Sequence, residues 1–322
     1  GTLFSFSLLV GVSRLWCSWA TRAQAHDQAI RALIWSHSHH WMVTADDAGV
    51  IKYWSSYDMK MRFQGHRQPI RSLSFSPSDR KFASSSDDGT VKIWDFEQCK
   101  DERTLQGHGW DVRCVQWHPT KPMVVSGGKD SKVKLWDAKT GTNLATLHDH
   151  KNAIAATEWN ANGNWLLTAS KDQKLKLFDI RMMKEIVTFL GHKNQVTTAA
   201  WHPFHETLFA SAGHDGTMMF HLTGSEEPAA EVVTAHDNSV WSMAWHPLGH
   251  ILVTGANDHF IKVWCRPRPG ETTWPRHNTD NDDATITATQ SGSAAAIPGL
   301  LKQGQSLPPQ LARLKDNYER QG

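Results

Sequence analysis

The sequence predicts an all-β fold built from six copies of one unit of about 42 residues. Three observations predict it: a histidine that recurs at that spacing, an alternation of apolar and polar residues after each histidine, and no helical periodicity between them. The composition points the same way, because 16 tryptophans and 19 histidines indicate that both residue types recur for a positional reason. We expect four short strands per unit.

Each unit opens on a histidine that follows Gly, Ala or Asp, at His26, His66, His108, His150, His192 and His236. A six-residue alternating stretch then ends in an aromatic, and this predicts a half-buried strand that closes on Trp35, Phe75, Trp117, Trp159, Trp201 or Trp245. A turn rich in Pro or Gly follows, and three units open it with Trp-His-Pro, at 117–119, 201–203 and 245–247. There we expect the proline to end the strand and the histidine to face solvent.

A second predicted strand ends in Ser or Thr, at Thr44, Ser84, Ser126, Thr168, Ser211 and Thr254. After an Asp turn, a third strand closes on an aromatic, at Trp54, Trp94, Trp136, Phe178 and Trp264. The Asp stands six residues before the aromatic at Asp88, Asp130, Asp172 and Asp258. Two units depart from this pattern. In the fifth unit a histidine, His221, stands where the aromatic is expected, six residues after Asp215. In the first unit Ala48 stands six residues before Trp54, and Asp46 and Asp47 come directly before it.

This pattern resembles the WD-repeat β-propeller. In such a blade the His, Ser or Thr, Asp and Trp side chains can form a chain of hydrogen bonds that satisfies buried polar groups. The resemblance therefore implies structural hydrogen-bond sets at His66, Ser84, Asp88 and Trp94; His108, Ser126, Asp130 and Trp136; His150, Thr168 and Asp172; and His236, Thr254, Asp258 and Trp264. We expect six full repeats plus the remnant of a seventh, around SRLW at 13–16.

The same residue types could suggest catalytic triads or metal sites. Catalysis requires one unique constellation, whereas these residues occur once per repeat at strand ends. The sequence contains no Gly-rich phosphate loop, carboxylate pair or HExxH motif. We therefore predict a non-enzymatic protein without a catalytic residue, cofactor, metal or small-molecule substrate.

Charge and cysteine content argue against several other classes of protein, namely nucleic-acid-binding, membrane-binding and disulfide-rich proteins. The 34 Lys and Arg residues against 32 Asp and Glu leave almost no net field to attract nucleic acid or an acidic membrane. Four cysteines without metal-ligand spacing are too few for a disulfide framework, so we expect a reducing compartment. The apolar run at 3–12 is weakly similar to a secretory signal and too short to span a bilayer.

Several segments resemble the WD-repeat subunit of the nuclear pre-mRNA cleavage and polyadenylation specificity factor, particularly its plant and algal members. They are QAHDQAIRALIWSH (24–37), GHGWDVRCVQWHPTKPMVVSGGKDSKVKLWD (107–137), NGNWLLTASKDQKLKLFDIR (162–181) and AHDNSVWSMAWHPLGHILVTGANDHFIKVWCRPRPG (235–270). The resemblance implies a nuclear scaffold beside a zinc-finger subunit and a large multi-propeller subunit, which helps the complex to hold AAUAAA in pre-mRNA. It also implies a basic N-terminal arm that supplies much of the RNA contact.

This sequence departs from that family at its start. Residues 1–23 contain only Arg14 and Arg22 as basic residues, so no RNA-binding position of the arm can be assigned, and RNA binding by the chain alone is expected to be weak. The chain resembles a truncated or misjoined family member. We divide it into an incomplete first repeat or non-native segment (1–23), a propeller (24–270) and a disordered polar tail (271–322). Closure of the ring would require residues 10–23 to pair onto its end.

Loop positions are the candidate binding residues. Residues two after each repeat histidine and residues just before each turn Asp should point to one face, and Trp110, Lys129 and Lys171 are the candidates there. An exposed Trp110 could anchor a partner or pack on the neighbouring loop, and the two lysines could meet phosphate or simply be solvated. Two alternatives remain open: a substrate-recognition propeller of a ubiquitin ligase or chromatin complex, and a propeller enzyme with one repeat-breaking cluster in its central channel.

Overall fold

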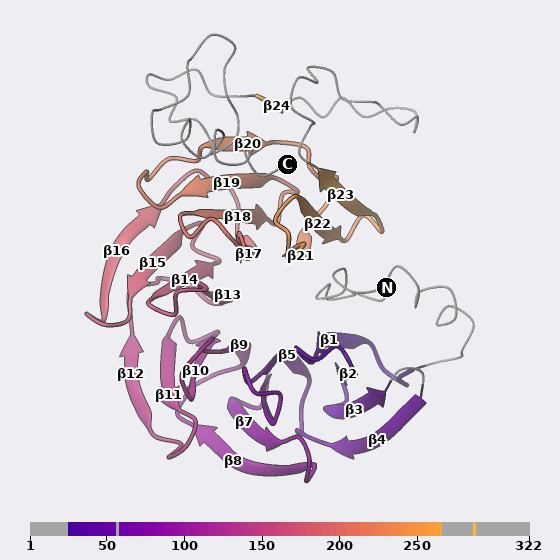
Figure 1. The fold of residues 1–322 in the computed structure, drawn as a ribbon. Helices are drawn as coiled ribbons and strands as arrows, with labels where there is room; N and C mark the ends of the chain where they lie inside the picture. The colour runs from indigo at the N-terminus through magenta and orange to yellow at the C-terminus, as the bar shows by residue number, and fades with distance from the viewer. Residues whose placement is uncertain (1–24, 56–57, 266–285, 288–322) are drawn as a thin grey trace, which may run out of the picture. The chain divides into compact units, whose positions relative to one another are not determined.

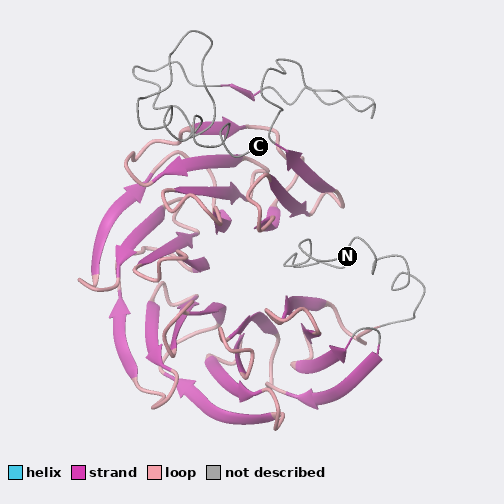
Figure 2. Cartoon of the chain, viewed as in Figure 1, coloured by secondary structure: helices cyan, strands magenta, loops and turns pink. Residues whose placement is uncertain are grey.

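The computed structural model describes residues 25–55, 58–265 and 286–287, and within them the chain is all β (Figure 2). No helix occurs in these ranges, so none of the described segments is a helix that could cross a membrane. All described residues fall in one unit, Gly1–Thr287; the second unit, Ala288–Gly322, lies outside them. The all-β prediction is confirmed.

Six antiparallel sheets follow one another along the chain, and we call them blades 1 to 6. Blades 1 and 2 consist of β1 (Ile30–Trp35), β2 (Trp41–Asp46), β3 (Val50–Ser55) and β4 (Asp58–Gln64), then β5 (Ile70–Phe75), β6 (Lys81–Ser86), β7 (Thr90–Asp95) and β8 (Lys100–Gln106). Blades 3 and 4 consist of β9 (Val112–Trp117), β10 (Met123–Gly128), β11 (Val133–Asp137) and β12 (Asn143–Leu147), then β13 (Ile154–Trp159), β14 (Trp165–Ser170), β15 (Leu175–Asp179) and β16 (Lys184–Phe189). Blade 5 consists of β17 (Val196–Trp201), β18 (Leu208–Gly213), β19 (Met218–Leu222) and β20 (Ala230–Val232), and blade 6 of β21 (Val240–Trp245), β22 (Ile251–Ala256) and β23 (Ile261–Cys265).

The first strand of each blade is innermost, and it contacts the first strand of the next blade in the order β1, β5, β9, β13, β17, β21 (Figure 1). This is a six-bladed β-propeller, as the six predicted units required. Blade 6 has three strands among the described residues, and β20 of blade 5 pairs with a two-residue strand, β24 (Ile286–Thr287). The expected pairing of residues 10–23, the seventh-repeat remnant and most of the tail lie outside the described residues.

The core lies between neighbouring blades, because each sheet buries the apolar side chains of both faces. Ile51 and Tyr53 of blade 1 pack with Ile70 and Phe82 of blade 2. Val133 and Leu135 of blade 3 likewise share a cluster with residues of blade 4, among them Ile154, Trp159 and Leu166. The alternating strand pattern of the sequence therefore defines interblade contacts, and each blade depends on its neighbours for burial.

One sequence prediction is wrong for two of its three residues: His118 and His202 of the Trp-His-Pro turns do not face solvent, whereas His246 is partly exposed. His118 is fully buried and its Nε2 lies 2.8 Å from the carbonyl oxygen of Gly163 in blade 4. His202 is buried in the same way, 3.0 Å from the carbonyl of Gly249 in blade 6. The proline ends the strand as expected, but the histidine ring extends to the turn of the next blade. There its Nε2 meets a glycine carbonyl oxygen that packing between the blades shields from water and that therefore requires a hydrogen-bond donor.

Candidate interaction surface

A chain of side-chain hydrogen bonds links the loop before each blade to its inner strands. In blade 2, Trp94 Nε1 donates to Ser84 Oγ at 2.8 Å, Ser84 Oγ lies 2.7 Å from His66 Nε2, and His66 Nδ1 lies 2.9 Å from Asp88 Oδ2. Since an indole N–H can only donate, the serine proton is available for His66 Nε2, and the ring proton then sits on Nδ1 facing the carboxylate. Every polar atom that links the four side chains thus has a hydrogen-bond partner.

The same set recurs where the sequence predicted it. The distances from His to Ser or Thr and from His to Asp are 2.8 and 3.0 Å at His108, 2.7 and 2.9 Å at His150, and 2.7 and 2.8 Å at His236. Trp136 and Trp264 complete two of these sets by donating to Ser126 and Thr254. These groups use their hydrogen-bonding capacity on one another, as expected for a structural role.

Blade 1 completes its set with a residue that the spacing rule missed. Asp46, eight residues before Trp54, accepts from His26 at 2.8 Å, and Thr44 joins His26 Nε2 to the Trp54 indole at 2.6 and 2.8 Å. Ala48 contributes only its N–H, which donates to Asp46. In blade 1 the carboxylate keeps its place beside the histidine ring, but the number of residues between it and the closing aromatic differs from that in the other blades.

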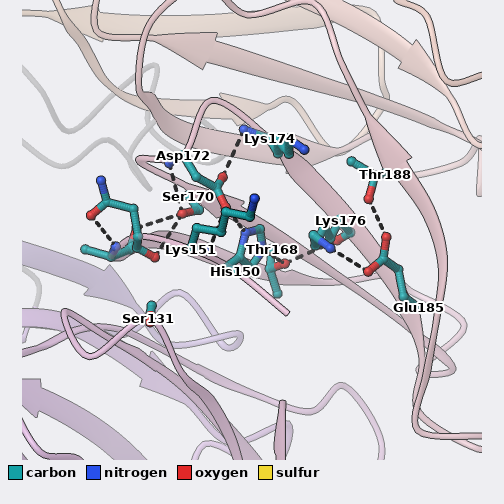
Figure 3. Close-up of polar contacts among 12 residues, drawn as sticks. Ser131, His150, Lys151, Thr168, Ser170, Asp172, Lys174, Lys176, Glu185 and Thr188 are labelled. Carbon is teal, nitrogen blue, oxygen red and sulfur yellow. Dashed lines mark hydrogen bonds and ion pairs between the residues drawn. The ribbon is translucent and has the colours of Figure 1, made fainter. Parts of the chain in front are cut away.

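Blade 4 shows how the turn Asp is held (Figure 3). Asp172 accepts from His150 and from the N–H groups of Lys151 and Lys174 at 3.1 Å each. Burial opposes ionisation of this carboxyl, but these hydrogen bonds outweigh it and lower the pKa of Asp172 to about 2. Phe178 stands at the place of the tryptophan, so the set here lacks an indole donor.

Blade 5 is the exception. Ser211 joins two histidines, His192 at 2.7 Å and His221 at 3.0 Å, while Asp215 accepts from Thr217. His221 stacks on Phe209, and its Nδ1 is buried with no hydrogen-bond partner among the described residues. Burial lowers the pKa of His192 to about 4 and that of His221 to about 3, so both rings are neutral in the fold.

We predict that His221→Phe raises the free energy of unfolding at pH 7 by about 1 kcal/mol, because removal of the buried, unpartnered Nδ1 outweighs loss of the contact between Nε2 and Ser211, which His192 still satisfies. The wild-type chain should lose stability as the pH falls below 6.5. In the unfolded state His221 becomes protonated below that pH, whereas in the folded state its pKa is about 3, so acid favours the unfolded state. His221→Phe should therefore reduce the loss of stability between pH 6.5 and 4. Urea unfolding across this range measures it.

The matched control is His148→Phe, which changes an exposed histidine and should leave the pH dependence of the urea midpoint as in wild type. Equal pH dependence of the His221→Phe and His148→Phe variants would show that the buried pair does not cause the acid sensitivity.

Two loops come together at one end of every blade, and we call this the loop end. In all six blades, the N–H of the residue before the turn Asp, or of Asp47 in blade 1, donates to a carbonyl in the loop after the repeat histidine. Neighbouring blades touch there too, because a Cβ on Gly49 or Gly216 would lie 2.3 or 1.9 Å from the carbonyl oxygen of His66 or His236 in the next blade. Both glycines have positive φ angles, 77° and 79°, so a side chain is disfavoured twice over.

The predicted residue Trp110 lies at the loop end of blade 3. Its side chain is 63% exposed, and Lys129 Nζ lies 5.9 Å from the ring centroid. Lys129 also lies 3.7 Å from Asp111, which accepts from Arg113 at 3.1 Å. The structure therefore places Lys129 beside Trp110, and it adds two charged neighbours that no sequence pattern indicates, Asp111 and Arg113.

Lys171, the third predicted residue, is exposed at the loop end of blade 4, and its N–H donates to the carbonyl of Ala153. Blades 1 and 2 differ at the equivalent place, where Arg31 pairs with Asp47 at 2.7 Å and Arg71 pairs with Asp87. Lysines thus replace those acidic partners in blades 3 and 4.

Comparison with known proteins accords with this geometry. Residues 19–55, 58–95, 99–137, 141–179, 183–221 and 229–265 match the family "WD domain, G-beta repeat". The chain belongs to this family. A WD domain, G-beta repeat propeller is typically a scaffold that binds other proteins, and the exposed loop end is the kind of surface that such a scaffold offers.

Three curated relatives of this WD-repeat chain carry the name "Polyadenylation factor subunit 2". The protein of Neurospora crassa is 65% identical over 34 residues, 11% of this chain and 5% of the relative. The protein of Gibberella zeae is 59% identical over 34 residues, which are 11% of this chain and 6% of the relative. The protein of Saccharomyces cerevisiae is 36% identical over 70 residues, which are 21% of this chain and 15% of the relative. The matched segments thus span at most 15% of the length of these relatives.

Proposed function

We propose that this chain is a non-enzymatic scaffold subunit in nuclear pre-mRNA 3′-end cleavage and polyadenylation. The observation that carries the proposal is its similarity to polyadenylation factor subunit 2 from three fungi, at 65%, 59% and 36% identity over short segments. The partners would be protein subunits of the cleavage and polyadenylation specificity factor. The propeller would contribute to recognition of the poly(A)-signal RNA within that complex.

The geometry supports a binding role over catalysis. The His, Ser or Thr, Asp and Trp groups are occupied by one another in repeated sets, which leaves them poorly placed to act on a substrate. By contrast, Trp110, Lys129 and Lys171 are exposed on loops that a rigid set of strands positions. An exposed tryptophan on such a loop has the properties of an interface anchor.

Affinity purification from nuclear extract tests the proposal. The tagged chain should enrich polyadenylation subunits, identified by mass spectrometry, over a matched tag alone. Enrichment of ubiquitin-ligase adaptors or chromatin subunits in their place would contradict the proposed function and favour the alternative class of WD-repeat protein.

We predict that the chain alone binds an AAUAAA oligonucleotide no better than a scrambled one. The 34 basic and 32 acidic residues nearly cancel, so binding releases few counterions, and residues 1–23 contain only two arginines. Fluorescence anisotropy at about physiological ionic strength, where charges are screened beyond about 8 Å, measures this. Sub-micromolar binding with a clear preference for the hexamer would contradict it and would mean that the propeller reads RNA by itself.

A further inference from the structure

The loop end carries more positive charge over blades 3 to 5 than over blades 1 and 2. In the loops of blades 1 and 2 the acidic residues outnumber the basic ones: Asp27, Asp46, Asp47, Asp87 and Asp88 against Arg31, Arg67 and Arg71. In the equivalent loops of blades 3 to 5 the balance is reversed: Arg113, Lys129, Lys132, Lys151, Lys171, Lys174 and Lys193 against Asp111, Asp130, Asp172 and Asp215. We call this second set the basic loop surface.

The acidic residues within the basic loop surface are already occupied. Asp130 and Asp172 accept from the repeat histidines, and their side chains are nearly buried. Asp215 accepts from Thr217, and Asp111 is shared between Arg113 and Lys129. Exposed Lys151, Lys171 and Lys193 form no ion pair with any carboxylate in the part of the chain that the structure describes. Their charge is therefore available to a ligand.

Amide groups add donors at the same end. Asn152 and Asn194 each accept the backbone N–H of the following residue through Oδ1, at 2.7 and 2.8 Å. Because a backbone N–H can bond only to the amide oxygen, this contact fixes each side chain with its Nδ2 donor on the other side. The basic loop surface thus presents ammonium and amide donors together, which suits a ligand rich in oxygen acceptors.

Trp110 supplies the apolar part of this surface. Its ring is mostly exposed beside Lys129, so an apolar side chain of a ligand could cover the indole while carboxylates meet the lysines. Single-stranded RNA is held in a different way, since successive bases stack on several aromatic or arginine planes. The loops of blades 3 to 5 contain one exposed tryptophan, Trp110, and the next one, Trp241 of blade 6, packs edge-on against His214. Arg113 is already engaged by Asp111.

We infer that the basic loop surface of blades 3 to 5 binds an acidic segment of a partner protein, with an apolar side chain on Trp110 and carboxylates at Lys171 and at the half-exposed Lys129, which would exchange Asp111 for the ligand. This inference rests on the proposed scaffold function and gives the chemistry of the partner. Complementary charge of this kind accelerates association and selects the partner.

The experiment uses a short fluorescein-labelled peptide of glutamates with one central leucine, and a labelled uridylate oligonucleotide of equal length. Anisotropy titrations compare the wild-type chain, the double variant Lys129→Glu/Lys171→Glu, and the control Lys121→Glu/Lys139→Glu. The control makes the same charge change at exposed lysines on turns at the opposite end of blade 3. Equal urea midpoints for the three chains ensure that only the surface differs.

We expect Lys129→Glu/Lys171→Glu to weaken peptide binding about tenfold and the control to change it by less than about twofold. Equal weakening by both variants, or no binding of the peptide to the wild-type chain, would overturn the inference. Tighter binding of the uridylate than of the peptide would overturn it too, and would assign the surface to nucleic acid. Capture of polyadenylation subunits by both double variants alike would leave the proposed function standing while this inference fails.

Discussion

Trp136→Ala should lower the free energy of unfolding by about 3–5 kcal/mol. Trp136 is one of the largest fully enclosed side chains of the described residues, 2% exposed, and it packs in a cluster with Val91 and Leu105 of blade 2. Its indole also donates to Ser126 Oγ at 2.8 Å. The substitution therefore opens a cavity between two blades and removes the donor of a hydrogen-bond set at once.

Trp136→Phe separates these two effects, because Phe178 occupies the equivalent place in blade 4. It keeps most of the apolar contact and loses the donor, so we expect a cost of about 1–2 kcal/mol. Urea or guanidinium unfolding followed by tryptophan fluorescence measures both variants. A Trp136→Ala chain as stable as the Trp136→Phe chain would show that interblade packing at this site is not what stabilises the blade.

Asp130→Ala should destabilise the chain by about 1–3 kcal/mol. The Asp130 carboxylate accepts from His108 Nδ1 at 3.0 Å, from the N–H of Gly109 at 3.1 Å and from that of Lys132 at 3.2 Å. Its removal leaves three hydrogen-bond donors without an acceptor, and the His108 ring loses the group that orients it. Lys132→Ala, in the same turn, should stay within about 0.5 kcal/mol of wild type, since the lysine side chain contributes none of these bonds.

The urea midpoints of the two variants provide the comparison. Equal midpoints for Asp130→Ala and Lys132→Ala would mean that the hydrogen-bond set does not stabilise the blade, and the structural interpretation of all five His–Asp sets would fail with it.

The sequence predicted the six blades and most of the hydrogen-bond sets because both depend on local spacing. His66 and Asp88 lie in one repeat, and the strands between them have fixed lengths, so their positions in the sequence determine their distance in space. Asp46 was missed because the turn of blade 1 places its carboxylate eight residues before Trp54, while the rule counted six. The buried histidine needs a hydrogen-bond acceptor, and the carboxylate that meets this need can stand at more than one distance along the sequence from the closing aromatic.

The contacts between blades were less predictable. His118 reaches the carbonyl of Gly163, 45 residues further along the chain, and no local pattern indicates that two turns meet there. The ion pair of Asp111 with Lys129 and Arg113 likewise depends on how two loops approach each other. Sequence could name Trp110 and Lys129 as loop residues, but only the structure shows that the lysine lies beside the indole.

We propose that the loop end of this WD-repeat propeller holds subunits of the polyadenylation machinery. The most direct test of this proposal is quantitative affinity purification from nuclear extract with the triple variant Trp110→Ala/Lys129→Ala/Lys171→Ala, beside the control Leu248→Ala/Lys121→Ala/Lys139→Ala. The control removes one exposed apolar side chain and two lysines from the opposite end of the blades. We expect the loop-end variant to lose most of the polyadenylation subunits that wild type enriches, while the control retains them. Retention by the loop-end variant, or equal loss from both, would contradict it.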